Sequence, residues 1–252
     1  RDLVTSCAEA LGSSASVGST ATNEETGEIV TLGNMSHGME AYGIGSIATN
    51  YGSVETRGED SHGMKATDGA QAVNFAGVVT TGDRSFGMYA EGAGSVVTNE
   101  ADGTVLTRGT DSVGMEAAYG ASATNEGSVR TEGHGAWGMA AYWESGATNN
   151  GSIVTTSDDA IGMVAMTSSD VTNTGSIVTN GTNAYGMWAS ENSGATNTET
   201  GSIVTKEQNA VGMYAYDHST AENAGSILTE NEGPNAWSHG MVAEDHSQAT
   251  NT

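Results

Sequence analysis

Apolar and polar positions alternate along most of the chain, in short blocks that recur. In the block Gly-Ser-Ile-Val-Thr at residues 151–155, Ile and Thr are kept from copy to copy while the residue between them varies. A second block, Gly-Met-x-Ala, keeps Met and Ala around an equally free position. A period of two is typical of a β-strand with one buried face and one face in water. The pattern therefore predicts short strands throughout the chain.

The blocks form a repeat of about 24 residues. Gly-Met occurs nine times, at spacings of 24 to 28 residues, and Ala always follows two positions after Met. A third block, Ala-Thr-Asn, precedes Gly-Ser-Ile-x-Thr and places an Asn in every repeat. Columns kept this strictly exclude a disordered chain and indicate an ordered array of repeats. The methionines of the column are Met39, Met64, Met88, Met115, Met139, Met163, Met187, Met213 and Met241.

Three strand blocks per repeat, separated by turns rich in Gly, Asn and Asp, describe one coil of a β-solenoid. Coils stacked about 4.8 Å apart place each kept residue beside its equivalent in the next coil. We therefore expect interior ladders of Ile/Val, Thr, Met, Ala and Asn, in which the Asn amides bond to one another or to turn backbone. The predicted fold is all-β, a parallel β-helix of about nine to ten coils, right-handed as parallel crossovers are.

The array is expected to occupy residues 21–252. Residues 1–20 lie outside the columns and are predicted to form an N-terminal cap or lead-in segment, with a short helix over 2–11 as one alternative. The last repeat is longer than the others and holds Pro234, the one proline of the chain, so we expect an enlarged loop at 230–239. We also expect the chain to be a piece of a longer array whose export signal lies elsewhere.

Composition fits a narrow core and restricts the partners. The chain has 36 Gly, one Pro and 6% aromatic residues, which suits an interior of small stacked side chains. Seven Lys and Arg against 31 Asp and Glu give a net charge of −24, so nucleic acid and anionic membranes are not expected as partners. No apolar run approaches the length of a membrane span, and we expect no membrane insertion.

We expect no enzyme activity and assign no catalytic residue. His37, His62 and His239 occupy a column that elsewhere holds residues such as Phe86 and Trp137, which favours packing over catalysis. No Ser, His and Asp set departs from the repeat as an added active site should. A polysaccharide lyase or hydrolase ranks third among the function classes, because the seven basic residues are scattered along the chain.

One turn column carries acidic residues. Asp60, Asp111 and Asp159 stand four positions before Met, and stacked turns would bring such side chains to one edge. Calcium prefers several oxygen ligands, so this edge is a candidate calcium site. The favoured alternative is that Asp simply suits a turn. No cofactor is expected apart from calcium at this edge.

Aromatic residues flank the kept Ala at positions that face outward. Rings on one side of a solenoid can stack on sugars, anchor a partner protein or be covered by a neighbouring chain. We therefore take them as a candidate contact surface, with packing at the molecular surface as the alternative. The residues are Tyr42, Tyr142, Trp143, Trp188, Tyr214 and Tyr216.

Over residues 21–252 the consensus A-T-N-x-G-S-I-x-T followed by A-x-G-M-x-A resembles the repeats in passenger domains of bacterial autotransporter adhesins. The resemblance implies a β-helix exported to the bacterial cell surface, where adhesion is the usual role. The chain departs from that pattern in its regular Met and in showing no translocator or signal.

The function predicted from the sequence is a secreted, extracellular or cell-surface β-solenoid that acts as a non-catalytic adhesin or stalk. Its partner would be a host or surface glycan or protein. The alternative is a structural subunit that assembles with copies of itself into an extracellular filament or sheath, because open solenoid ends expose unpaired strands.

Overall fold

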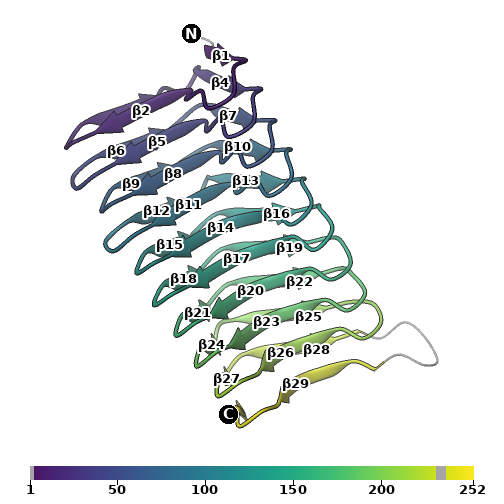
Figure 1. Cartoon of the computed structure of the whole chain (residues 1–252). Coiled ribbons are helices and arrows are strands. Elements are labelled where there is room, and N and C mark those ends of the chain that lie inside the picture. Colours follow the sequence, from purple (N-terminus) through teal and green to yellow (C-terminus); the bar gives the residue numbers. More distant parts are fainter. Residues whose placement is uncertain (1–2, 231–236) are drawn as a thin grey trace.

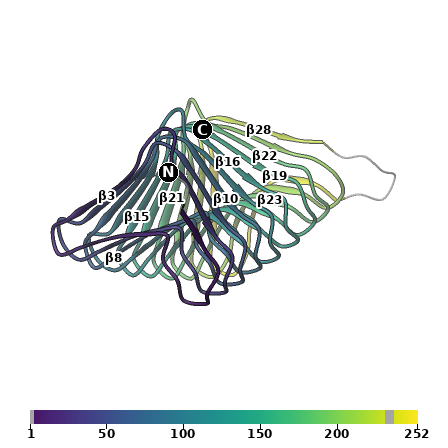
Figure 2. The ribbon, with the colours of Figure 1, turned by 90° about the horizontal axis from the view of Figure 1, so that it is seen from above.

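A computed structural model describes residues 3–230 and 237–252. In this part of the chain, 30 strands form three parallel sheets of ten strands, one strand of each sheet per coil (Figure 1). This confirms the predicted all-β parallel solenoid of about ten coils, whereas its handedness stays a prediction. Viewed along the stack, successive coils are turned relative to one another (Figure 2). No described residue lies in an α-helix, so none of the described segments is a helix able to cross a membrane.

The three sheets are named after the residues they bury. The Ile/Val sheet consists of β1 (Leu3–Thr5), β4 (Glu28–Thr31), β7 (Ser53–Thr56), β10 (Gly77–Thr80), β13 (Thr104–Thr107), β16 (Ser128–Thr131), β19 (Ser152–Thr155), β22 (Ser176–Thr179), β25 (Ser202–Thr205) and β28 (Ser226–Thr229). The Met sheet consists of β2 (Ser13–Ser16), β5 (Met39–Tyr42), β8 (Met64–Thr67), β11 (Met88–Glu91), β14 (Val113–Ala118), β17 (Trp137–Tyr142), β20 (Ile161–Met166), β23 (Tyr185–Ser190), β26 (Val211–Ala215) and β29 (His239–Ala243). The Asn sheet consists of β3 (Thr20–Asn23), β6 (Ile47–Asn50), β9 (Gln71–Asn74), β12 (Val96–Asn99), β15 (Ser122–Asn125), β18 (Gly146–Asn149), β21 (Asp170–Asn173), β24 (Gly194–Asn197), β27 (Thr220–Asn223) and β30 (Gln248–Asn251).

The register places like residues on like residues. Met139 pairs with Met163, and the same one-coil step joins Ile153 to Ile177. The kept Met side chains from Met39 to Met213 are fully buried. The interior ladders predicted from the columns are therefore confirmed, and unbranched Met side chains fill the central space.

The Asn column forms a continuous side-chain ladder. From Asn23 to Asn223, each Nδ2 donates to Oδ1 of the Asn in the next coil, at 2.6 to 2.8 Å, and Asn251 is the last acceptor. The same amides also donate to turn carbonyls, as Asn149 does to Ser176 at 3.2 Å. A buried amide that donates and accepts along the stack satisfies its hydrogen-bonding groups and fixes the register of the coils.

Glycines of the repeat allow the coils to approach closely. A Cβ added to Gly162 would lie 2.4 Å from Ile177 Cγ2 and 2.5 Å from the Gly186 carbonyl oxygen. A Cβ on Gly151 would lie 2.1 Å from the Gly127 carbonyl oxygen. Glycine can serve a turn that needs positive φ, or it can allow two backbones to approach closely. Close approach of neighbouring coils is its role at both of these positions.

The N-terminal region corrects an expectation. The helix considered for residues 2–11 is absent from the described part of that segment, since residues 3–5 form β1 and residues 13–16 form β2. Leu3 pairs with Ile29, and Ser13 pairs with Met39. This segment continues the coil because its alternating side chains and free backbone groups extend the sheets of the next coil. Most of the enlarged loop expected at 230–239 lies outside the described residues.

Candidate contact face and the pocket at Glu116

The outer face of the Met sheet carries three rows of side chains, which we call the contact face. The first row stands two residues before Met: His37, His62, Phe86, Val113, Trp137, Ile161, Tyr185, Val211 and His239. The second row follows Met: Glu40, Lys65, Tyr89, Glu116, Ala140, Val164, Trp188, Tyr214 and Val242. The third row stands three residues after Met: Tyr42, Thr67, Glu91, Ala118, Tyr142, Met166, Ser190, Tyr216 and Glu244.

In its central coils this face is more buried than the alternation predicts. All six residues of β14 are buried, and β20 has five buried residues out of six. The expectation that the position after Met faces water is therefore wrong here. Ala140 and Val164 belong to a second apolar cluster, against which large half-buried side chains such as Trp137 and Trp188 pack. Large residues thus cover their small neighbours on the outer face.

Five of the six predicted contact residues fall into two aromatic groups. Tyr142 and Trp143 have ring centroids 5.4 Å apart, and Trp143 stacks on Tyr119 at 4.4 Å. The second group joins Trp188 to Tyr214 at 5.1 Å and Tyr214 to Tyr216 at 6.4 Å. The sixth residue, Tyr42, is exposed on β5 and has no ring contact with a described residue.

The histidine side chains at the N-terminal end of the first row pack against the rings of neighbouring coils. His37 stacks on His62 at 4.7 Å, and His62 stacks on Phe86 at 4.6 Å. Burial, with a smaller contribution from Lys65, lowers the pKa of His37 to about 4. Burial, with the charges of His37 and Lys65, lowers the pKa of His62 well below its usual value. Both imidazoles are therefore neutral at neutral pH and act as flat packing groups.

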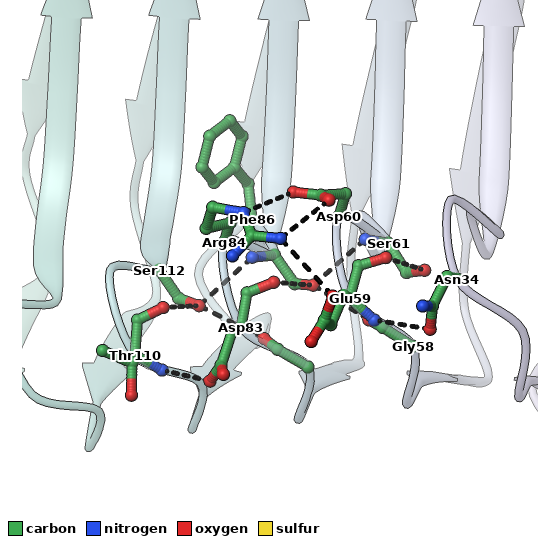
Figure 3. Close-up of polar contacts among 12 residues, drawn as sticks. Asn34, Gly58, Glu59, Asp60, Ser61, Asp83, Arg84, Phe86, Thr110 and Ser112 are labelled. Carbon is green, nitrogen blue, oxygen red and sulfur yellow. Dashed lines mark hydrogen bonds and ion pairs between the residues drawn. The ribbon is translucent and has the colours of Figure 1, made fainter.

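The acidic turn edge does not assemble the three Asp residues proposed as calcium ligands. Arg84 and Gly135 occupy the intervening coils of the same column, so the Asp side chains are separated by two coils, or about 10 Å. Arg84 donates from Nε and Nη2 to the two carboxylate oxygens of Asp60, at 3.0 and 3.1 Å (Figure 3). Asp159 accepts a hydrogen bond from Asn183 at 3.1 Å.

Backbone geometry explains why Asp recurs on this edge. Asp60, Asp111 and Asp159 have φ of 52°, 51° and 57°, in the left-handed region that Asp and Asn tolerate better than most residues. Within residues 3–230 and 237–252, no three His, Cys, Asp or Glu side chains gather into a group able to hold a metal ion. Calcium binding at this edge stays a prediction without support from the side-chain arrangement.

A pocket of about 490 Å³ opens on the contact face above β14 and β17. Two of its lining residues, Asp111 and Glu116, carry carboxyl groups. The remaining lining residues are Phe86, Val113, Gly135, Trp137, Tyr142 and Trp143. Glu116 is only 8% exposed, and its carboxyl group forms no hydrogen bond or ion pair with a described residue.

Burial, with a smaller contribution from the charge of Glu91, raises the pKa of Glu116 to about 8. The carboxyl group is therefore largely protonated at neutral pH. The repeat pattern alone does not single out this residue, because the position after Met varies from repeat to repeat as a surface position does. The available signal was an acidic residue in a row whose other members include Tyr89, Val164 and Trp188.

These features define the class of protein: a parallel β-helix with a buried polar ladder and an aromatic outer face. The chain belongs to the family described as BigA third pectate lyase-like domain, whose model matches residues 2–125 and 95–252. The two matches overlap and together span residues 2–252, as expected where one repeat recurs. No curated protein matches the chain, and no solved structure does. The family supports the β-helix part of the resemblance drawn from the consensus.

Proposed function

We propose that this protein is a non-catalytic β-solenoid of the bacterial cell surface or extracellular space that adheres to a glycan or protein through its contact face. The observation that carries the proposal is the concentration of aromatic side chains on one of the three sheets. Tyr119 and Trp143, at the edge of this face, are 50% and 43% exposed and stack with an interplanar angle of 1°. Flat rings that are already ordered by stacking on each other lose little conformational entropy on binding.

The proposal of a non-catalytic role rests on the ion pairs that the arginines form with carboxylates. Arg57 and Arg130 are 2.7 and 2.8 Å from carboxylate oxygens, and Arg84 and Arg108 lie 3.0 and 3.1 Å from theirs. An arginine paired in this way is held by its carboxylate and is poorly placed to bind or deprotonate an anionic sugar. The name of the family includes a lyase, so a polysaccharide screen that releases product would overturn this part of the proposal.

The adhesion proposal is tested by binding of the purified chain to arrays of glycans and immobilised surface proteins. Removing one exposed ring with Tyr119→Ala should weaken binding about 10-fold, as expected for an aromatic interface anchor. Tyr51→Ala is the matched control, because Tyr51 is 41% exposed and stacks on Phe75 at 4.8 Å but lies away from the contact face. Equal losses from both variants, or no binding by the wild-type chain, would overturn the proposal.

Electron microscopy separates adhesion from the alternative of a filament subunit. The filament alternative rests on the general tendency of an unpaired sheet edge to add further strands. Separate short rods are expected for an adhesin or stalk. Long fibres with a fixed axial repeat would instead favour self-assembly into a filament or sheath.

A further inference from the structure

The pocket at Glu116 combines aromatic walls with a negative electrostatic character. Four of its lining residues carry aromatic rings: Phe86, Trp137, Tyr142 and Trp143. Two of its lining residues, Asp111 and Glu116, carry carboxyl groups, and no Lys or Arg lines it. The whole chain carries a net charge of −24, so the surrounding field also favours a cation.

The ionised form of Glu116 would have no positively charged partner among its neighbours in the sheet. Its neighbours across the ladder are Tyr89 on β11 and Ala140 on β17, neither of which supplies a positive charge. Glu91 on β11 is acidic. Lys65, one strand beyond Tyr89, places its ammonium over the Tyr89 ring at 5.8 Å. A carboxylate that is nine-tenths buried is costly unless a cation pairs with it.

We propose that this pocket binds an organic ammonium group, with the aromatic rings packed around the cation and Glu116 as its counter-charge. Rings attract a cation through their negative faces, most strongly where water is excluded. A neutral sugar would gain the ring contacts without any charge attraction, whereas an ammonium group gains both. The inference extends the proposed function by assigning a ligand class to one site on the contact face.

Proton release should accompany binding. In the empty pocket burial holds the proton on Glu116, whose pKa is raised to about 8, whereas a bound ammonium favours the ionised form. The other titratable groups that interact with Glu116 or share its pocket are Tyr89, Glu91, Asp111 and Tyr142. Burial, together with nearby acidic groups, raises the pKa of both tyrosines, so they stay neutral across the tested range. Affinity for the cation should therefore rise about 10-fold per pH unit below 8 and level off above it.

The test uses choline, a trimethylammonium compound, and its uncharged isostere 3,3-dimethylbutan-1-ol. Isothermal titration of the full chain should show choline binding at least about 10-fold more tightly than the isostere. Titrations near pH 6.5 in buffers of different ionisation enthalpy should show release of nearly one proton per choline bound. Equal affinity for the two compounds, or no binding of choline at millimolar concentration, would overturn the proposal.

Two variants locate the site. Glu116→Gln keeps the shape of the side chain but removes its charge, so choline affinity should fall at least about 10-fold and its pH dependence should disappear. Glu40→Gln is the matched control: Glu40 is a Glu of the same row that lies outside the pocket lining, and its substitution should leave choline binding unchanged. Trp137→Leu should also weaken binding. Unchanged affinity in Glu116→Gln, with its circular dichroism spectrum intact, would contradict the proposal.

The choline titration and the adhesion assay can fail independently of each other. Tyr216 is 41% exposed on the contact face, and neither it nor its ring partner Tyr214 lines the pocket, so Tyr216→Ala should reduce adhesion while leaving the affinity for choline unchanged. A chain that adheres but does not bind choline would overturn the ammonium site alone. A chain that binds choline but adheres to nothing would overturn the proposed function alone.

Discussion

At the scale of single residues, the buried Thr column of the Ile/Val sheet contains two chemically different sites. Thr56 donates its hydroxyl to the Ser61 carbonyl at 2.9 Å, whereas the Thr155 hydroxyl has no hydrogen-bond partner among the described residues. Both side chains are fully buried. Their hydroxyls therefore contribute differently to stability although they occupy the same column.

Replacing each Thr with the nearly isosteric Val measures that difference. Thr155→Val removes an unpaired buried hydroxyl, so the free energy of unfolding should stay constant or rise by about 1 kcal/mol. Thr56→Val removes a hydrogen bond and should lower it by about 1 kcal/mol. Urea denaturation followed by circular dichroism measures both, and equal losses would contradict the assignment of a bond to Thr56 alone.

Glu116 makes stability depend on pH in a predictable direction. Its pKa rises from 4.5 to about 8 on folding, so the native state binds the proton more tightly between these values. The stability that this proton contributes is complete below pH 4.5 and is lost as pH rises to 8 and beyond. Glu116→Gln should remove this loss, of about 3 to 5 kcal/mol.

The measurement is the difference in unfolding free energy between variant and wild type at pH 5, 7 and 9. His37 and His62, whose pKa values are lowered, destabilise both proteins equally as pH falls below 6.5, so their contribution cancels in the difference. Glu40→Gln should leave the loss in place. A difference that does not grow with pH would show that Glu116 is already ionised at neutral pH in the folded protein.

At the scale of strands, close packing between coils depends on particular glycines. Gly162 in β20 lies where an added Cβ would meet both a side chain and the backbone of the next coil. Gly146, the first residue of β18, has no atom within 4 Å of its added Cβ. The two positions form a matched pair for the same substitution.

Gly162→Ala should lower the free energy of unfolding by about 3 kcal/mol or more, because the contact with backbone cannot be relieved by a rotamer change. Gly146→Ala should raise it by up to about 1 kcal/mol, since Ala restricts the unfolded chain and fits the strand. Thermal denaturation of both variants measures the effect. A Gly162→Ala protein as stable as the wild type would show that the coils can move apart.

The interior of each coil was predictable because every position there meets its own equivalent. Asn149 contacts Asn173, so an amide kept in every repeat is enough to predict the ladder. The outer face is different, because its burial depends on unlike residues in neighbouring coils. Glu116 stands between Tyr89 and Ala140, and the pocket arises from that local combination. A consensus does not record which unlike residues meet in neighbouring coils, so the repeat pattern could not identify Glu116.

At the scale of the whole molecule, charge opposes the stacked fold. The net charge of −24 is spread over a rod in which the described arginines are already paired with acidic groups. Mutual repulsion among the remaining carboxylates lowers the stability of the compact state, and dissolved salt screens it. General screening and specific calcium binding at the Asp60, Asp111 and Asp159 edge would both raise stability on addition of calcium, so the two must be separated.

Raising NaCl from about 0.02 M to about 0.5 M should raise the melting temperature, because the Debye length falls from roughly 20 Å to below 5 Å. CaCl2 and MgCl2 at matched ionic strength should then give equal melting temperatures, since the aspartates of the turn edge are two coils apart and Arg84 already binds Asp60. Thermal denaturation followed by circular dichroism provides the comparison. A clear excess stabilisation by calcium that disappears in Asp111→Asn or Asp159→Asn would establish a specific site that forms only when the ion draws these turns together. Salt dependence without that excess would identify the acidic edge as a row of left-handed turn residues whose charges are screened by dissolved ions.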